Sequence, residues 1–344
     1  MADGSERSGT RPSPGSGAEA TGVSRRLAMA LFGGALAGGL VELITDRTLG
    51  PEPVASLPTG SAPASAPASA SQQTSAAPPS PSAAPTSPTA APTAPPLPPA
   101  PPATAFAAEP ALRAALTEIP RGKNVAFGLG VLDARTGRRV AVEVGSPFEM
   151  ASTVKVDILV ATYVAAAARG RGLTATQRAQ ASTMIRNSDN AAATSLFRAA
   201  GRAAGLNALY RALGLTGTTS SSSWGLTTTT PADRLVVLDA LARGGGGLSP
   251  EHGAEILALM RSVAASQRWG IGGAAAAGET VAVKNGWLPR SSQGGRWIIS
   301  TSGLLTGPDT DLRLAVCSRG HASQAAGITF IEKVLKAARA SLSV

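Results

Sequence analysis

A stretch of 55 residues without a single charge, from Val54 to Ala108, most constrains what this chain can fold into. It consists almost entirely of Ala, Pro, Ser and Thr, and 17 of the chain's 26 prolines lie in residues 51–108. So few bulky apolar side chains cannot offset the conformational entropy that folding removes. We therefore predict a disordered, extended linker over residues 46–108 and one folded domain over residues 109–344.

The segment before the linker, residues 27–45, is predicted to be a signal peptide or a membrane anchor. Arg25 and Arg26 precede an uncharged run of 15 residues, 27–41. This is near the upper limit of a signal-peptide core and short of the roughly 20 apolar residues of a spanning helix. With the flanking Ser and Leu, the two arginines resemble a twin-arginine export signal. Positive charge before the run keeps residues 1–26 in the cytoplasm, so both interpretations place the folded domain outside it.

The predicted domain is basic, with 26 basic and 15 acidic residues in 109–344 and a net charge of +11. Such a charge suits nucleic acid, an anionic membrane or an anionic envelope polymer. The basic residues are scattered and no Lys/Arg run exceeds two, which argues against nucleic acid. With only Cys317, His252 and His321, the chain has no zinc-ligand set and no intramolecular disulfide. We expect a cell-envelope partner, no metal and no cofactor.

The order of predicted elements indicates an α+β domain. A hairpin comes first, then a block of helices, three strands and a final helix, so the strands of one antiparallel sheet come from both ends of the domain. The predicted strands are Asn124–Asp133, Arg138–Val144, Thr280–Lys284, Arg296–Ser300 and Leu312–Ser318. The predicted helices are Ala151–Ala168, pieces of 177–214, two that start at Thr230-Pro231 and Ser249-Pro250, and one from near Ser323.

The first pattern that can carry chemistry is Ser152 followed three residues later by Lys155, at the start of a predicted helix. Three residues make nearly one helical turn, so the hydroxyl and the amine lie on one face. A serine hydroxyl needs a base to become a nucleophile, and a desolvated lysine can be that base. N–H groups at the helix start can stabilise an oxyanion. The simpler alternative is an N-cap serine with a surface lysine.

The second pattern is Ser188-Asp189-Asn190. A serine here can relay a proton to a leaving group, and the Asn190 amide can hold a substrate carbonyl. Taken alone, the tripeptide is better explained as a helix cap.

The third pattern is Lys284-Asn285-Gly286, followed by Trp287, at the predicted end of a strand. A lysine there can hold a substrate carboxylate, and a neighbouring glycine lets a substrate backbone lie along the strand. The alternative is an ordinary strand-ending turn.

Together the three patterns occur once each, in the order S-x-x-K, S-D-N and K-x-G. In this respect the chain resembles the serine β-lactamase and penicillin-binding protein superfamily, and most closely the class A β-lactamases. The resemblance covers essentially all of residues 109–344. Residues 147–156 are similar to the nucleophile segment of that family, and residues 228–231 to its Thr-Thr-Pro helix start. It implies a β-lactamase-like fold, an antiparallel sheet flanked by helices, with a reduced all-helical subdomain.

The resemblance also implies roles for individual residues. Ser152 would be the acylated nucleophile, Lys155 its base, and Ser188 the group that passes a proton to the leaving nitrogen.

The implied substrate-binding residues are Asn190, Lys284, Asn285, Gly286 and Trp287. Asn190 would hold the substrate amide and Lys284 the substrate carboxylate. The backbone N–H groups of the nucleophile and of Trp287 would form the oxyanion hole.

Two departures from the family bear on turnover. No Asp or Glu lies between Asp189 and Asp233, the interval in which class A enzymes carry their deacylating glutamate. Asn285 also replaces the usual hydroxyl residue of the third motif. Without an activating carboxylate, water attacks an acyl-enzyme slowly.

The sequence thus predicts a monomeric, extracytoplasmic serine hydrolase that is acylated by a β-lactam or a related amide or ester and deacylates slowly. Two alternatives stay open. One is a D,D-peptidase of peptidoglycan stem peptides. Comparing the turnover of a D-Ala-D-Ala peptide with that of a cephalosporin would distinguish it from a β-lactamase. The other is a non-catalytic module that binds β-lactams or the cell wall, although a pure binder needs no proton relay.

Overall fold

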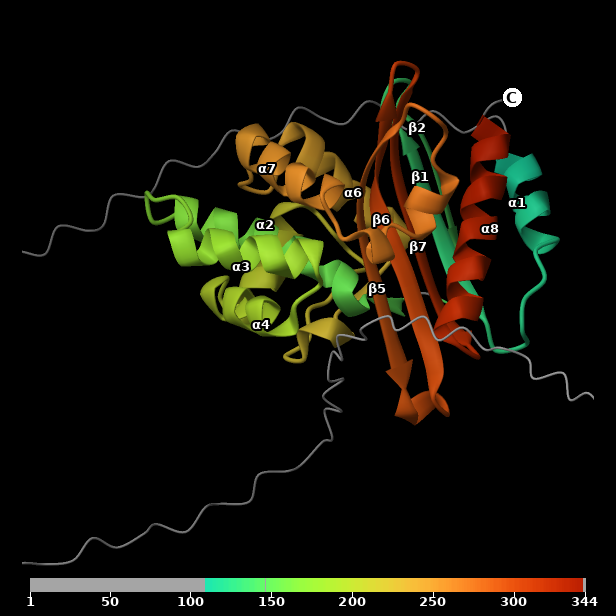
Figure 1. Ribbon diagram of the computed structural model, residues 1–344, viewed down its shortest axis with the longest axis horizontal. Helices are drawn as coiled ribbons and strands as arrows, with labels where there is room; N and C mark the ends of the chain where they lie inside the picture. Colours follow the sequence, from blue (N-terminus) through green and yellow to red (C-terminus); the bar gives the residue numbers. More distant parts are fainter. Residues whose placement is uncertain (1–108, 146, 343–344) are drawn as a thin grey trace, which may run out of the picture. The chain divides into compact units, whose positions relative to one another are not determined.

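The computed structural model describes residues 109–145 and 147–342 (Figure 1). The predicted basic N-terminus (1–26), signal peptide or anchor (27–45) and linker (46–108) lie outside the described residues. Within those ranges, no helix combines the length and apolar character that crossing a bilayer requires.

A five-stranded antiparallel sheet runs through the middle of the domain in the order β2-β1-β7-β6-β5. The N-terminal hairpin joins the three C-terminal strands because β1 pairs with β7, which confirms the predicted α+β class. The strands are β1 Ala126–Asp133, β2 Arg138–Glu143, β5 Thr280–Arg290, β6 Arg296–Gly307 and β7 Thr310–His321. A separate two-residue strand, β3 (Phe148–Glu149), pairs with β4 (Thr228–Thr229).

Helices cover both faces of the sheet (Figure 1). α8 packs on β6 and β7 with α1 beside it, while α6 lies across β1 and β7 on the other face, next to the remaining helices. The helices are α1 Glu109–Thr117, α2 Val154–Ala167, α3 Ala175–Arg186, α4 Asn190–Ala199, α5 Arg202–Ala212, α6 Pro231–Arg243, α7 Pro250–Arg261 and α8 Gln324–Leu342. Short 3₁₀ turns are η1 Ala151–Thr153, η2 Trp224–Leu226, η3 Ala265–Gln267, η4 Gly270–Ala274 and η5 Ser291–Gln293.

The two helix starts predicted from proline are confirmed. The Thr230 hydroxyl accepts a hydrogen bond from the Asp233 N–H at the start of α6, and Ser249 accepts one from the His252 N–H at the start of α7. In both helices proline follows the cap, where its missing N–H costs nothing.

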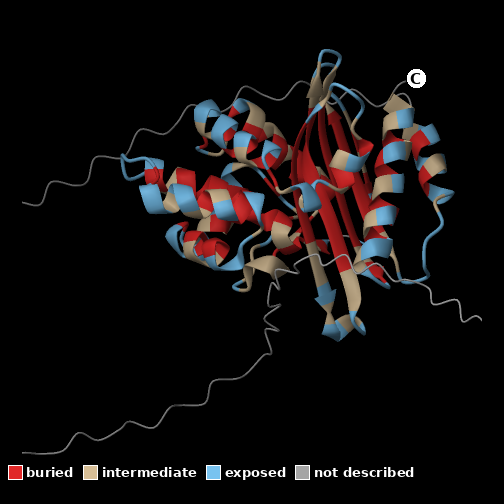
Figure 2. Ribbon diagram, viewed as in Figure 1, coloured by how far each residue is buried: buried red, intermediate tan, exposed pale blue. Residues whose placement is uncertain are grey.

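Two glycines of β1 allow α6 to lie directly on the sheet. A Cβ on Gly128 would come within 2.6 Å of Pro231 Cγ, and one on Gly130 within 2.8 Å of the Pro231 carbonyl oxygen. Larger side chains would push the first turn of α6 away from the sheet. The strands between the two helical layers are accordingly buried in Figure 2.

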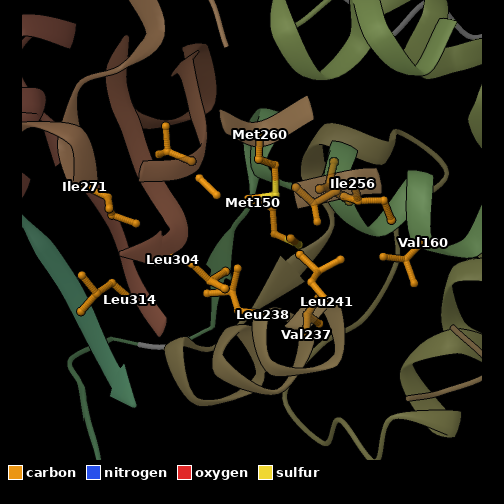
Figure 3. Close-up of a cluster of buried hydrophobic side chains, with 14 of the residues drawn as sticks. Met150, Val160, Val237, Leu238, Leu241, Ile256, Met260, Ile271, Leu304 and Leu314 are labelled. Atoms are coloured by element: carbon orange, nitrogen blue, oxygen red, sulfur yellow. The ribbon is translucent and has the colours of Figure 1, made fainter. Parts of the chain in front are cut away.

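The hydrophobic core lies on both faces of the sheet, under α6 and α7 on one face and under α8 and α1 on the other. Figure 3 shows Met150 among side chains such as Leu238, Leu241 and Leu304, and Met150 is fully buried. Burying one such side chain contributes roughly 1.5–3 kcal/mol. The core therefore anchors the chain two residues before Ser152.

The sequence-based end of the third predicted strand is wrong. β5 continues from Thr280 to Arg290, so Lys284, Asn285 and Gly286 lie in its middle. An Asn-Gly pair is a turn signal, but β5 is an edge strand of the sheet. An edge strand tolerates glycine and proline because one side of its backbone has no strand partner, and Pro289 is accommodated in the same way.

Candidate active site

The proposed nucleophile lies on a tight turn that leads into α2. Ala151, just before Ser152, has φ of +48°, a left-handed conformation that is uncommon for a residue other than glycine. The Thr153 hydroxyl donates to the Met150 carbonyl (2.7 Å), and the Met150 N–H donates to the Thr227 carbonyl (2.8 Å). These bonds keep half-buried Ser152 at the N-terminal end of the helix, where backbone N–H groups lack helical partners.

The structure brings Ser188 and Asn190 into contact with the Lys155 amine. Lys155 Nζ donates to the Ser188 carbonyl (2.6 Å), to Asn190 Oδ1 (2.7 Å) and to Ser188 Oγ (3.1 Å). Among the described residues no hydrogen bond joins Ser152 to Lys155, although one helical turn separates them. Catalytic hydrogen bonds often tighten only when substrate is bound.

The turn that carries the second motif is both a helix cap and part of the site. The Asp189 side chain accepts a hydrogen bond from the Ala192 N–H (2.7 Å) and caps α4. Ser188, before it, has φ of +60°, and this left-handed conformation directs both its carbonyl and its hydroxyl towards Lys155. The cap therefore holds the functional residues in place.

Lys284 reaches the same serine from the sheet. Its Nζ donates to Ser188 Oγ (3.0 Å) and to the Asn285 carbonyl (3.0 Å). Because Ser188 Oγ accepts from two amines, its own proton is left to donate elsewhere. That arrangement suits a proton relay.

Burial changes the acidity of both lysines. It lowers the pKa of Lys155 to about 7, and the charge of Asp189 opposes this shift only in part. It also lowers the pKa of Lys284 well below the usual lysine value, and the neighbouring charge of Lys155 adds to the effect. The lowered pKa makes the neutral Lys155 amine, the form that can take a proton, accessible near neutral pH.

The Asn285 side chain is not brought to these residues. Its Nδ2 donates to the carbonyls of Gln267 (2.8 Å) and Trp269 (3.0 Å). Gln267 ends η3, and Trp269 directly precedes η4. The sequence analysis expected this side chain to bind substrate. In the structure both amide hydrogens are used to hold a neighbouring loop, since successive strand residues face opposite sides of the sheet.

The side chain of Trp287, two residues after Asn285, lies on the same face of the sheet as that of Asn285. Its ring packs edge to face against Trp269, with ring centroids 6.0 Å apart. The role suggested for its backbone N–H in an oxyanion hole stays a prediction.

Gly286 brings the backbone of β5 against the nucleophile turn. A Cβ at this position would be 2.7 Å from the Met150 carbonyl oxygen and 2.8 Å from the Ser152 nitrogen, both rigid backbone atoms. We predict that Gly286→Ala displaces Ser152 and slows acylation by about 10²-fold, the cost of misplacing a reacting group by about 1 Å. Labelling with a fluorescent penicillin measures this rate.

The matched control is Gly172→Ala, because nothing lies within 4 Å of a Cβ at Gly172. Equal labelling rates for the two variants would show that the close approach of β5 has no role in the site.

Two features of the site were missed by the sequence analysis. Trp224 lies with its ring 5.0 Å from Lys155 Nζ, and its indole N–H donates to Thr194 Oγ1 (3.2 Å). A lone tryptophan in a Ser- and Thr-rich loop, in a chain with only 3% aromatic residues, was the available signal.

The second missed feature is a buried charge cluster behind the catalytic helix. Arg234 Nη1 lies 2.7 Å from Asp157 Oδ2, which also accepts a hydrogen bond from the Tyr210 hydroxyl (3.0 Å). Asp157 is 0% and Arg234 1% exposed. The cluster joins α2 to α5 and α6, and an aspartate within the apolar run after Lys155 was its signal.

The two carboxylates that flank the acid-free interval, Asp189 and Asp233, both accept hydrogen bonds that hold neighbouring segments in place. Asp189 caps α4, as described above, and Asp233 Oδ2 accepts from the Gly217 N–H (2.8 Å) and the Thr218 hydroxyl (2.7 Å). In the described part of the chain, no three His, Cys, Asp or Glu side chains gather into a possible metal site.

Solved structures share this fold. PBP-A matches with a TM-score of 0.60 at 20% identity, covering 71% of this chain and 98% of PBP-A. A β-lactamase from Sphaerobacter thermophilus matches with a TM-score of 0.57 at 21% identity, covering 68% and 97%. A mutant class A β-lactamase of the last common ancestor of Gram-negative bacteria matches at 0.56 and 22%, covering 67% and 98%. At these identities the likeness establishes the fold alone.

A search of curated protein sequences finds no match. A family model described as "Beta-lactamase enzyme family" matches residues 167–341, half of the chain. The matched range begins after Ser152 and Lys155 and includes Ser188, Asn190 and Lys284. On this match, the chain belongs to the β-lactamase enzyme family.

Proposed function

We propose that this protein is an extracytoplasmic serine hydrolase of the class A β-lactamase-like type, acylated on Ser152 by a β-lactam or a related amide or ester. One observation carries the proposal. The Lys155 amine is buried, has a pKa of about 7, and lies one helical turn from Ser152 in contact with Ser188. A surface lysine after a helix cap would have the same spacing, but it would be neither buried nor in contact with Ser188.

The positions of these groups support the following acylation step. Neutral Lys155 takes the proton of Ser152, and Oγ attacks the substrate carbonyl carbon. The carbon–nitrogen bond then breaks, Ser188 gives its proton to the leaving nitrogen, and the Lys155 ammonium returns a proton to Ser188 Oγ. General base catalysis of this kind contributes about 10²–10⁴-fold, and oxyanion-hole donors about 10²–10³-fold each.

Deacylation is proposed to be slow because no carboxylate is available in the loop. The interval 190–232 contains no Asp or Glu, and Asp189 and Asp233 are held by backbone and side-chain donors. One of the matching solved structures, a mutant of PBP-A 21% identical to this chain, is an acyl-enzyme complex with penicillin G.

We further propose that residues 27–45 export or anchor the chain and that residues 46–108 tether a monomeric domain, 109–344, in the cell envelope. The uncharged run after Arg25 and Arg26 and the proline-rich composition support this arrangement.

The test is intact-mass measurement of the full chain after incubation with penicillin G. We expect a long-lived adduct of one penicillin per chain. Its rate of formation should rise about tenfold per pH unit below pH 7 and level off above it, because only neutral Lys155 accepts the serine proton.

Other outcomes would contradict the proposal in distinct ways. If the protein formed no adduct and hydrolysed no penicillin, acylation of Ser152 would be excluded. Rapid cleavage of a D-Ala-D-Ala peptide with poor turnover of a cephalosporin would favour the peptidase. Tight penicillin binding without a change of mass would favour the binding module.

A further inference from the structure

Trp224 occupies a place beside the catalytic lysine that the mechanism has not used. It begins η2, in the segment between α5 and β4, and its half-buried ring lies face-on to Lys155 Nζ at 5.0 Å. The indole N–H donates to Thr194 Oγ1 on α4 at 3.2 Å, which fixes the plane of the ring.

The segment that carries Trp224 is tied to the nucleophile turn. Thr227 accepts from the Met150 N–H (2.8 Å), and Thr219 and Thr228 exchange two backbone hydrogen bonds of 3.0 Å. These bonds fix the backbone of the Trp224 segment against the turn before Ser152, and the indole bond to Thr194 fixes the ring on that backbone.

The groups that face the Lys155 amine come from three directions. Ser188 and Asn190 contact it at the start of α4, with the charge of Asp189 between them, and Lys284 approaches from β5. Trp224 covers a further side. The Lys155 side chain is 0% exposed, so these neighbours leave bulk water no direct access to it.

We propose that Trp224 is a positioning residue that keeps water away from Lys155 Nζ. By doing so it maintains the lysine as a base, and it denies a hydrolytic water a place beside the acyl ester. The second effect rests on the proposed acylation of Ser152, whereas the first can be measured without any substrate.

The ring has two opposing effects on the lysine. An aromatic face attracts the ammonium form, and exclusion of water disfavours it. Burial lowers the pKa of Lys155 overall, although the charge of Asp189 favours the charged form. Burial is therefore the larger effect on Lys155, and because the ring is one of the groups that bury this amine, we expect its removal to admit water and raise the pKa.

The experiment follows the titration of the lysine Nζ groups by NMR in the full chain without substrate, for the wild type, Trp224→Ala, Trp224→Phe and Thr194→Val. The chain has only five lysines, which simplifies assignment. We expect Trp224→Ala to raise the Lys155 pKa by about one unit or more. Trp224→Phe, which keeps a ring, should stay near the wild type, and Thr194→Val, which removes only the indole's acceptor, should shift it slightly upward.

A parallel measurement follows the lifetime of the penicillin adduct by mass. We expect Trp224→Ala to shorten it by about tenfold, within the range of water-activation effects. Trp297→Ala removes a tryptophan of β6 as the matched control and should change neither the pKa nor the lifetime.

The outcomes separate this inference from the proposed function. An unchanged Lys155 pKa in Trp224→Ala would overturn the inference, and if that variant does not fold, an unchanged pKa in Thr194→Val would do so. A raised pKa in a protein that forms no adduct would support the positioning role and contradict acylation of Ser152. A raised pKa with an unchanged adduct lifetime would refute the exclusion of hydrolytic water.

Discussion

Replacing Ser152 by alanine is expected to abolish formation of the penicillin adduct. Loss of a serine nucleophile costs on the order of 10⁶-fold in rate, because the base and the relay then have no hydroxyl to act on. The Ser152→Ala protein should keep its fold, since the buried anchor of the segment is Met150 and the turn is held by Thr153 and Thr227. Intact-mass measurement after prolonged incubation with penicillin G should show the adduct in the wild type and none in Ser152→Ala.

Ser222→Ala is the matched control, because Ser222 is exposed on the loop beside the site. It should be acylated as fast as the wild type. An adduct that persists in Ser152→Ala would place the nucleophile on another residue.

The largest expected effect on stability comes from the buried pair of Asp157 and Arg234. Arg234→Met removes the cation that pairs with the fully buried Asp157 carboxylate, at a cost of about 3–5 kcal/mol. For a domain of this size, that corresponds to a fall in Tm of roughly 6–20 °C. Thermal unfolding followed by circular dichroism measures the change.

Two controls make this prediction specific. The double replacement of Asp157 by Leu and Arg234 by Met should regain much of the loss, because no unpaired charge stays buried. Arg113→Ala, which breaks the exposed pair with Glu109, should cost no more than about 1 kcal/mol. A wild-type Tm in Arg234→Met would show that the buried pair does not stabilise the fold.

Much of the architecture was accessible from sequence because its signals are local. The Thr230-Pro231 and Ser249-Pro250 helix starts depend on a cap and a proline within one turn, and both are present. The three motifs were found for the same reason. Each is a short run of residue types that can be recognised without knowing the rest of the fold.

The features that sequence missed depend on contacts between distant segments. Whether Asn285 belongs to a turn or to a continuing strand is decided by β6, which pairs with β5 through Arg290. The stacking of Trp224 on Lys155 and the pairing of Arg234 with Asp157 join residues 69 and 77 positions apart in the chain. No periodicity within a single element encodes such pairings.

The pairing of β1 with β7 has a consequence for how the domain forms. These neighbouring strands come from opposite ends of the domain, so the five-stranded sheet cannot be completed until the segment up to β7 is available. Contacts of such long sequence separation slow folding and leave strand edges exposed in the meantime. We therefore expect the domain to fold late, after β7 has been synthesised, and a chain truncated before Thr310 to lack the strand that joins β1 to β6.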